Sequence, residues 1–167
     1  VIGCRAADAI TTTAADGTVA IGDSALGALT SGAGNTAVGY QALKTTGTGG
    51  WNTAVGYQAA DILPDGANAN TAVGYDALGA GNNGSTDHNT CVGFEAGNAI
   101  TTGSQNTIIG SGPDPGAADA VNQTVIGYAV TSPDTDNSVT LGNADVTAVY
   151  MSSDGGAQVS CGTLGIG

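Results

Sequence analysis

Basic residues are almost missing from this chain of 167 residues. Only Arg5 and Lys44 are basic, whereas Asp and Glu together number 14, so the formal net charge is −12. Such a surface repels phosphate backbones, which makes nucleic acid a poor partner. It also lacks the basic face that anionic membranes attract. No apolar run approaches the length of a membrane span, so we expect no membrane insertion.

Aromatic side chains are also scarce, at 4% of the residues, although apolar residues make up 41%. Alanine, valine, isoleucine and leucine must therefore fill any core. Glycine is abundant, with 29 residues, while proline occurs only 4 times. These glycines follow no strict three-residue period, which excludes collagen. Glycine combined with recurring valine and isoleucine favours a regular structure with many tight turns.

The residues that enzymes use are nearly absent. His88 is the single histidine and lies in the segment "STDHN". A catalytic triad would need it beside a positioned nucleophile and an acid, and the preceding Asp87 is a common loop coincidence. Paired carboxylates for glycoside hydrolysis usually lie in long aromatic-lined grooves, which this composition does not favour. We therefore expect no enzymatic activity, no catalytic residue and no organic cofactor.

Metal-ligand patterns are weak as well. Cys4, Cys91 and Cys161 follow no metal-ligand spacing, and an odd number of cysteines cannot pair fully within one chain. Isolated, partly buried thiols are the favoured interpretation, with an interchain disulfide as the alternative. Asp134 and Asp136, in "SPDTDNS", are weak candidate ligands for calcium, which binds alternating oxygen ligands. A plain Asx-turn is favoured there, because a complete calcium-binding loop is missing.

What the sequence does contain is a repeated nine-residue word. "NTAVGYQAL" begins at Asn35 and returns as "NTAVGYQAA" at Asn52, "NTAVGYDAL" at Asn70 and "NTCVGFEAG" at Asn89. Alignment on the glycine of the word gives nine copies, spaced 15 to 19 residues apart. These glycines are Gly3, Gly22, Gly39, Gly56, Gly74, Gly93, Gly110, Gly127 and Gly142. The spacing predicts a solenoid in which each copy forms one rung.

The columns of this alignment predict one short strand per copy. The residue before the glycine is β-branched in eight of nine copies, as at Val38, Val55 and Val73. Two positions earlier the residue is again β-branched, and most often Thr. Period-two spacing places these two columns on one strand face and the intervening small residues on the other. Neither face is charged, so we expect both to be buried, one inside the coil and one against another chain.

Three further columns predict how the rungs are joined. The Asn column, which includes Asn35, Asn52, Asn70 and Asn89, predicts a ladder of side-chain amides along the coil. The glycines predict a sharp corner with positive φ, where a Cβ would clash. The Tyr or Phe after the glycine, followed by Ala and often Leu, predicts a second short strand or bend on the same core.

The stretches between the words vary in length and read as turns and loops. Trp51 lies in one of them, in the segment "GTGGWNT". One interpretation is a loop anchor that folds over its own coil. The other is an exposed platform on which a sugar ring could stack, which makes Trp51 a candidate ligand contact.

The words "NTAVGYQAL", "NTAVGYDAL" and "NTIIGSG" resemble the stalk repeats of phage tail fibres and tailspikes, specifically of fibres that end in an endosialidase-type intramolecular chaperone. A related pattern occurs in the heads of trimeric autotransporter adhesins, where short repeats build a left-handed β-roll. The resemblance covers residues 1–144. The segment "SVTLGNADVTAVYMSS" resembles the exit of such stalks, whereas the chaperone region with its self-cleavage site is not in this sequence.

The resemblance implies a parallel homotrimer, with one apolar face of each coil turned toward the threefold axis. We therefore expect an all-β chain, with a β-solenoid or β-roll stalk of about nine rungs over residues 1–144 and a connector over residues 145–167. The expected function is that of a structural fibre segment, in an extracellular virion tail fibre or cell-surface appendage, which displays a host-binding tip.

Three alternatives stay open at this point. The chain could be a trimeric adhesin whose loops contact surface glycans, or a subunit that self-associates end to end into an extracellular filament. An ice-binding solenoid is suggested by the Thr column. That interpretation is disfavoured here because the threonines are expected to share a buried face with valine and isoleucine.

Overall fold

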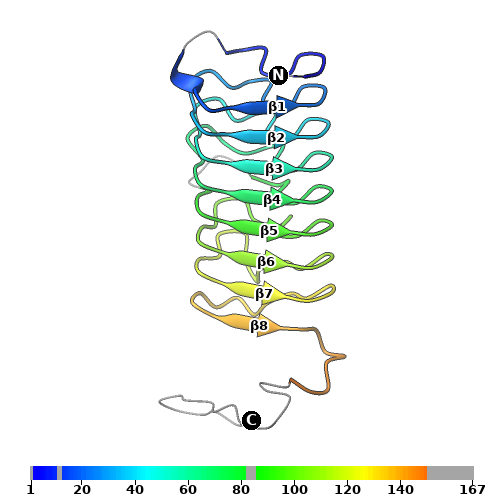
Figure 1. Cartoon of the computed structure of the whole chain (residues 1–167). Helices are drawn as coiled ribbons and strands as arrows, with labels where there is room; N and C mark the ends of the chain where they lie inside the picture. The colour runs from blue at the N-terminus through cyan, green and yellow to red at the C-terminus, as the bar shows by residue number, and fades with distance from the viewer. Residues whose placement is uncertain (1, 11–12, 82–85, 150–167) are drawn as a thin grey trace, which may run out of the picture.

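Each copy of the repeated word from the second onward forms one short strand (Figure 1). The computed structural model describes residues 2–10, 13–81 and 86–149. The strands form one parallel sheet in sequence order. They are β1 (Val19–Ile21), β2 (Thr36–Val38), β3 (Thr53–Val55), β4 (Thr71–Val73), β5 (Thr90–Val92), β6 (Thr107–Ile109), β7 (Thr124–Ile126) and β8 (Val139–Leu141). The predicted all-β solenoid is therefore confirmed.

The two ends of the rod depart from this pattern. The first copy contributes only an isolated bridge, in which Ile2 pairs with Ile21, so the nine copies give eight strands and one bridge. A 3-10 turn, η1 (Thr13–Ala15), precedes β1. Beyond β8 the described chain continues to residue 149 without a strand, and most of the expected connector, with Cys161, lies outside the described residues. Within the ranges described, no helix is long and apolar enough to cross a membrane.

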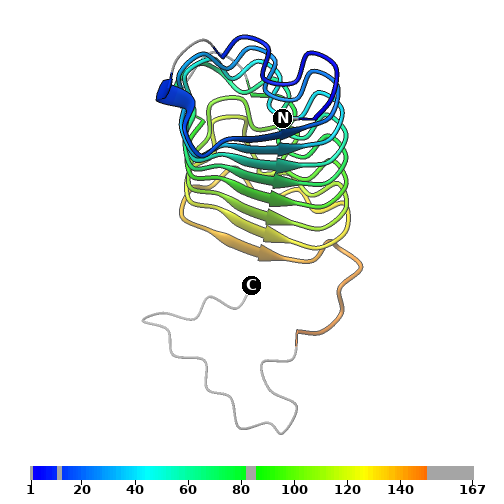
Figure 2. The ribbon, with the colours of Figure 1, turned by 45° about the horizontal axis from the view of Figure 1, so that its top comes forward.

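Neighbouring strands pair in register, without any slip between copies. Thr53 pairs with Thr36 on one side and with Thr71 on the other, and the same holds for the residues that follow each of them. The coils therefore lie directly over one another behind the sheet (Figure 2). Because of this register, every column of the sequence alignment becomes a column of side chains along the rod.

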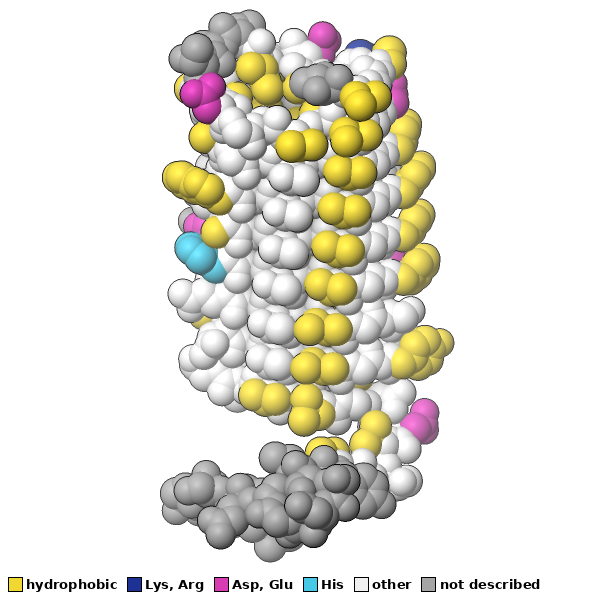
Figure 3. All heavy atoms as spheres, viewed as in Figure 1, with side chains coloured by type: hydrophobic (Ala, Val, Ile, Leu, Met, Phe, Trp, Pro, Cys, Tyr) yellow, Lys and Arg dark blue, Asp and Glu magenta, His cyan; other side chains and the backbone are white. Residues whose placement is uncertain are grey.

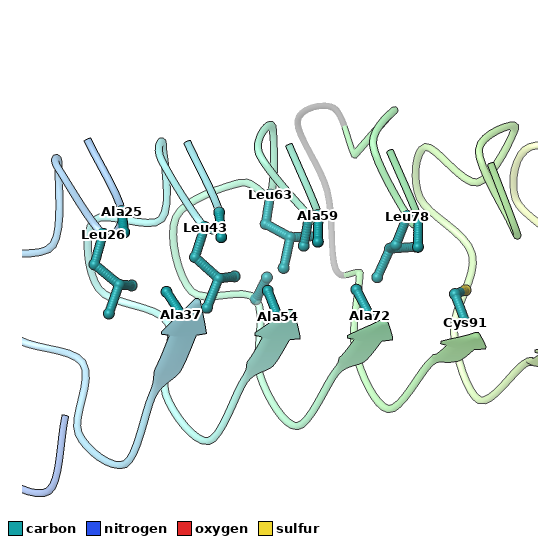
Figure 4. Packing of buried hydrophobic residues seen from close by; sticks show 14 of the residues in the cluster. Ala25, Leu26, Ala37, Leu43, Ala54, Ala59, Leu63, Ala72, Leu78 and Cys91 are labelled. Atoms are coloured by element: carbon teal, nitrogen blue, oxygen red, sulfur yellow. The ribbon is translucent and has the colours of Figure 1, made fainter. Parts of the chain in front are cut away.

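The middle residue of each strand points into the coil and is fully buried in β1 to β7. In four of the first five strands this residue is alanine, and leucines from the opposite wall, such as Leu43, reach toward it (Figure 4). At the fifth strand both facing residues change in size: the strand residue is larger than alanine, and the residue on the opposite wall is smaller than leucine. Cys91 stands in the alanine column and Gly97 in the leucine column, where a Cβ on Gly97 would lie 2.5 Å from the Cys91 Sγ. At these rungs, a small side chain on one wall thus faces a large one on the other.

The glycine after each strand makes the corner that the sequence predicts. Gly39 has a φ of +138°, and a Cβ there would lie 2.1 Å from the carbonyl oxygen of Gly56 in the next rung. The following residues alternate back into the left-handed region, with φ values of 57° at Gln41 and 51° at Leu43. The segment after the glycine is therefore a bend, which returns Leu43 to the core. No second strand forms here.

Candidate functional site

The outer face of the sheet is the most extensive regular surface of the molecule. The first and third residues of each strand point outward, so the Thr column and the Val/Ile column run side by side along the rod. Figure 3 shows the Val/Ile column as a continuous hydrophobic row, with an uncharged column beside it. Val55 and Ile109 are each 37% exposed, and Ile126 is 39% exposed.

One of the two strand faces lies inside the coil, as expected, and it is the face of the middle residues; the burial of the other face against a second chain stays a prediction. Only the middle residue of a three-residue strand can point into the coil, so the larger valine and isoleucine side chains face outward and the smaller alanines face inward. A row of partly exposed β-branched residues over eight strands is an apolar patch of the kind that marks an interaction surface.

This orientation also removes the argument made against ice binding. The threonines of β2 to β7 share the outer face with valine and isoleucine, and this face is partly exposed. They form a regular outward row at the strand spacing of about 4.8 Å. The threonine row alone therefore does not distinguish an ice-binding surface from an interface between chains.

A second surface column consists of stacked aromatic rings. The ring centroids of Tyr40 and Tyr57 are 5.0 Å apart, those of Tyr57 and Tyr75 are 5.5 Å apart, and those of Tyr75 and Phe94 are 5.1 Å apart. The expectation that these rings pack on the core is wrong, because Tyr40 is 41% exposed. Each ring covers the face of the next, so the column stabilises neighbouring rungs and presents mainly ring edges. A sugar ring would find no free face between them.

Inside the coil, the Asn column forms the predicted amide ladder. The Oδ1 atom of Asn52 accepts hydrogen bonds from both the backbone N and the Nδ2 of Asn70, each at 3.0 Å. The same pair of bonds links Asn35 to Asn52, Asn70 to Asn89 and Asn89 to Asn106. These five residues are buried. The ladder therefore holds the loop side of the coil in the same register as the sheet.

Trp51 stands on the surface, in the column that precedes the Asn ladder. Its side chain lies against Gly34 of the preceding rung, where an added Cβ would come within 3.0 Å of the indole Cδ1. The residue is nevertheless 69% exposed. Trp51 thus combines features of both interpretations, since it rests on its own coil and still offers much of its surface to solvent.

His88 and Asp87 both form hydrogen bonds to the preceding rung. The Asp87 Oδ1 accepts a hydrogen bond of 2.7 Å from the backbone N of Asn68, and the backbone N of His88 donates to the Asn68 carbonyl at 3.0 Å. Asp87 and His88 therefore both join their own rung to the preceding one.

Of the two weak calcium candidates, Asp136 also joins two rungs. Its Oδ1 accepts a hydrogen bond of 2.8 Å from the backbone N of Val121. Asp134 is exposed. Across the described part of the chain, no group of three or more His, Cys, Asp or Glu side chains is arranged to hold a metal ion.

Aspartate carboxylates form a recurring hydrogen bond between rungs that the sequence analysis did not predict. Four aspartates each accept a hydrogen bond from a backbone N–H of the preceding rung, at 2.7 to 2.9 Å. They are Asp65, Asp87, Asp114 and Asp136. They lie in loops of different length, so no single alignment column contains them.

Two further aspartates lie near each other on adjacent rungs. Burial, and to a smaller extent the neighbouring Asp76, raises the pKa of Asp61, whose Oδ1 is buried without a hydrogen bond. Burial also raises the pKa of Asp76. Burial therefore favours the protonated form of both carboxyl groups in the folded chain.

No family model, curated protein or solved structure matches this chain. Its function is therefore inferred from the solenoid and its surfaces.

Proposed function

We propose that this chain is a structural stalk segment of an extracellular fibre, of the kind found in phage tail fibres or surface appendages. In this role it assembles as a parallel homotrimer and holds a host- or surface-binding tip away from the particle. Its mechanical strength comes from rungs that share continuous backbone, amide and aromatic ladders.

The observation that carries the proposal is the outer face of the sheet. It presents a Val/Ile row along β1 to β7 and a Thr row along β2 to β7, and neither row contains a charge. The remaining surface of the molecule is strongly acidic, with a net charge of −12 for the chain. An uncharged apolar face on an acidic rod is what an interface between like-charged chains requires.

A parallel arrangement follows from the regularity of this face. Each rung presents nearly the same outward residues at the same spacing, so two parallel chains can bring equivalent rows together along their full length. Three such rods around an axis would cover the Val/Ile rows. The sheet would then be buried on both sides, which explains why uncharged β-branched residues occupy its outer columns.

Mass measurement in solution tests the proposal. The chain should have three times its mass of 15.9 kDa at micromolar concentration. Val73→Lys places a charge on the proposed interface and should yield monomers, since a buried unpaired charge costs several kcal/mol. Ile62→Lys is the matched control, because Ile62 is exposed in a turn away from the sheet face. A monomeric native chain would refute the trimeric stalk.

The same measurement addresses ice binding, the second use that the outer face permits. A monomer would leave the regular Thr and Val/Ile rows open to water. Thermal hysteresis that is lost on replacing the central threonine, Thr71→Tyr, would then support an ice-binding solenoid. A trimer that shows no thermal hysteresis would argue against it.

An adhesin with glycan-contacting loops is supported by a single residue, Trp51, which is 69% exposed. Glycan-array binding that is abolished by Trp51→Ala would favour that function over a passive stalk. Electron micrographs of the native protein distinguish either function from an end-to-end filament, which would extend far beyond the length of one subunit.

A further inference from the structure

The only two basic side chains of the sequence, Arg5 and Lys44, line the same surface pocket. The pocket has a volume of about 280 Å³, and Asp8, Ser24 and Gly27 are also among its lining residues. It spans three successive rungs at the N-terminal end of the coil, from the first copy of the word to the copy that forms β2.

Stacking in register explains why a hollow forms at this place. Ser24 and Gly27 belong to the middle rung of the three, in columns where the next rung carries Gln41 and Lys44. Backbone hydrogen bonds fix this alignment, since the Ser24 N donates to the Cys4 carbonyl of the rung before. The middle rung thus has short side chains between two rungs with long ones, and the pocket is the space they leave.

The same stacking places the two cations on opposite rims. Arg5 comes from the rung before Ser24 and shares its column, whereas Lys44 comes from the rung after it and shares the column of Gly27 and Asp8. Their backbones are therefore two strand spacings apart along the rod and three residues apart across it, which makes the separation more than about 10 Å. Both side chains are long enough to reach a group held between them. The floor that separates them is mostly uncharged and includes Gly27 and Ala28.

The charge of the rims leaves capacity for a ligand. Within the described residues, the only ion pair joins the Arg5 Nη2 to the Asp23 Oδ2, at 3.2 Å. Lys44 forms no such pair, and its charge acts on Asp61 in the same column of the next rung, where it offsets part of the rise in the pKa of that carboxyl group. A guanidinium has five N–H donors, so the bond to Asp23 leaves others available. Asp8 is the one carboxylate that lines the pocket, and it lies on the Arg5 side in sequence.

We propose that this pocket binds a small molecule that joins an anionic group to a partly apolar body, with the carboxylate of an acidic monosaccharide as the favoured case. The carboxylate lies between Lys44 and Arg5, which donate charge-assisted hydrogen bonds to it. The C–H face of the sugar lies on the short side chains of the middle rung. A mostly apolar pocket with a few placed polar groups is the usual form of a small-molecule site. The site requires neither a trimer nor a fibre.

Titration calorimetry with glucuronate tests the site, with glucose as the neutral comparison and inorganic phosphate as the anion without a sugar body. Glucuronate should bind, and glucose should bind at least about tenfold more weakly, the change expected when a charge-assisted contact is lost. Phosphate binding as tight as that of glucuronate would overturn the sugar assignment. Equal affinity for glucose and glucuronate would overturn the site itself.

Two variants separate the charge of the pocket from its shape. Lys44→Gln should weaken glucuronate binding about tenfold by removing one cation. Ser24→Gln should have a comparable effect by filling the hollow, and Gln41 shows that this column accepts glutamine at positive φ. Gln105→Glu is the matched control, since it makes the same change in net charge at an exposed residue several rungs away. Unchanged binding in Lys44→Gln would refute the proposal.

Discussion

The amide ladder is the feature of this fold whose removal has the most calculable effect, and Asn70→Ala tests it at the centre. The Asn70 Nδ2 donates to the Thr86 carbonyl at 2.6 Å and to the Asn52 Oδ1 at 3.0 Å. Its Oδ1 accepts from the backbone N of Asn89 at 2.9 Å and from the Asn89 Nδ2 at 3.2 Å. All of these groups are buried.

The magnitude follows from the groups that the substitution leaves without these partners. The Asn52 Oδ1 keeps the backbone N of residue 70, and the Asn89 Nδ2 keeps the Gly103 carbonyl. The backbone N of Asn89 and the carbonyl of Thr86 lose the bonds that Asn70 supplies. Each buried unsatisfied group costs about 1–3 kcal/mol, so Asn70→Ala should lower the free energy of unfolding by about 2–6 kcal/mol.

Urea denaturation at one fixed protein concentration measures this change, because any association between chains makes apparent stability depend on concentration. Gln105→Ala is the control. Gln105 is an exposed amide, and Ala69 occupies the same left-handed column without difficulty. The control should change stability by less than about 0.5 kcal/mol. If Asn70→Ala cost less than about 1 kcal/mol, the ladder would not hold the rungs together as argued.

Three further predictions concern the corner, the acidic pair and the buried thiol. Gly74→Ala should destabilise the protein by about 3 kcal/mol or more in denaturation, through backbone strain and a clash with the next rung, whereas Gly66→Ala, with open space around it, should cost about 1–2 kcal/mol. Folding raises the pKa of Asp61 and Asp76, so the folded state binds more protons than the unfolded state. The melting temperature should therefore rise as the pH falls from 7 toward about 4, the pKa of an aspartate in the unfolded chain. A melting temperature that falls over this range would contradict the prediction. Burial raises the pKa of the Cys91 thiol to about 12, so peptide mapping after thiol labelling should find it unmodified in the native protein and modified in urea, and labelling under native conditions would contradict its burial.

The sequence predicted the rungs because the requirements of a corner and a ladder are local. A glycine with a φ near +140° and an asparagine that bonds its own counterpart must recur from rung to rung, whatever the loops between them do. The glycine therefore appears in every copy, as at Gly39, and the asparagine in the five central copies, from Asn35 to Asn106. Register followed from the same letters, since only one alignment keeps every glycine beside a glycine.

Which face of the strand is buried could not be read in the same way. In a usual sheet the larger apolar residues face the core, but this coil is so narrow that alanine faces inward and valine faces outward, as at Ala54 and Val55. The size of the side chains, rather than their hydropathy, determines which face of the strand points into the coil. The surface pocket was also hidden, because Arg5 and Lys44 are far apart in sequence until the rungs are stacked.

Every strand pairing in this sheet joins residues that are close along the chain. Thr36 pairs with Thr53, Thr71 with Thr90 and Thr124 with Val139, so the chain separation of a contact is 15 to 19 residues and does not grow with the length of the rod. Parallel sheets usually fold slowly because their contacts are distant in sequence. Here a longer chain only lowers the relative contact order. Whole copies of the word can accordingly be gained or lost between generations, which alters the reach of the rod and leaves every remaining contact as it was.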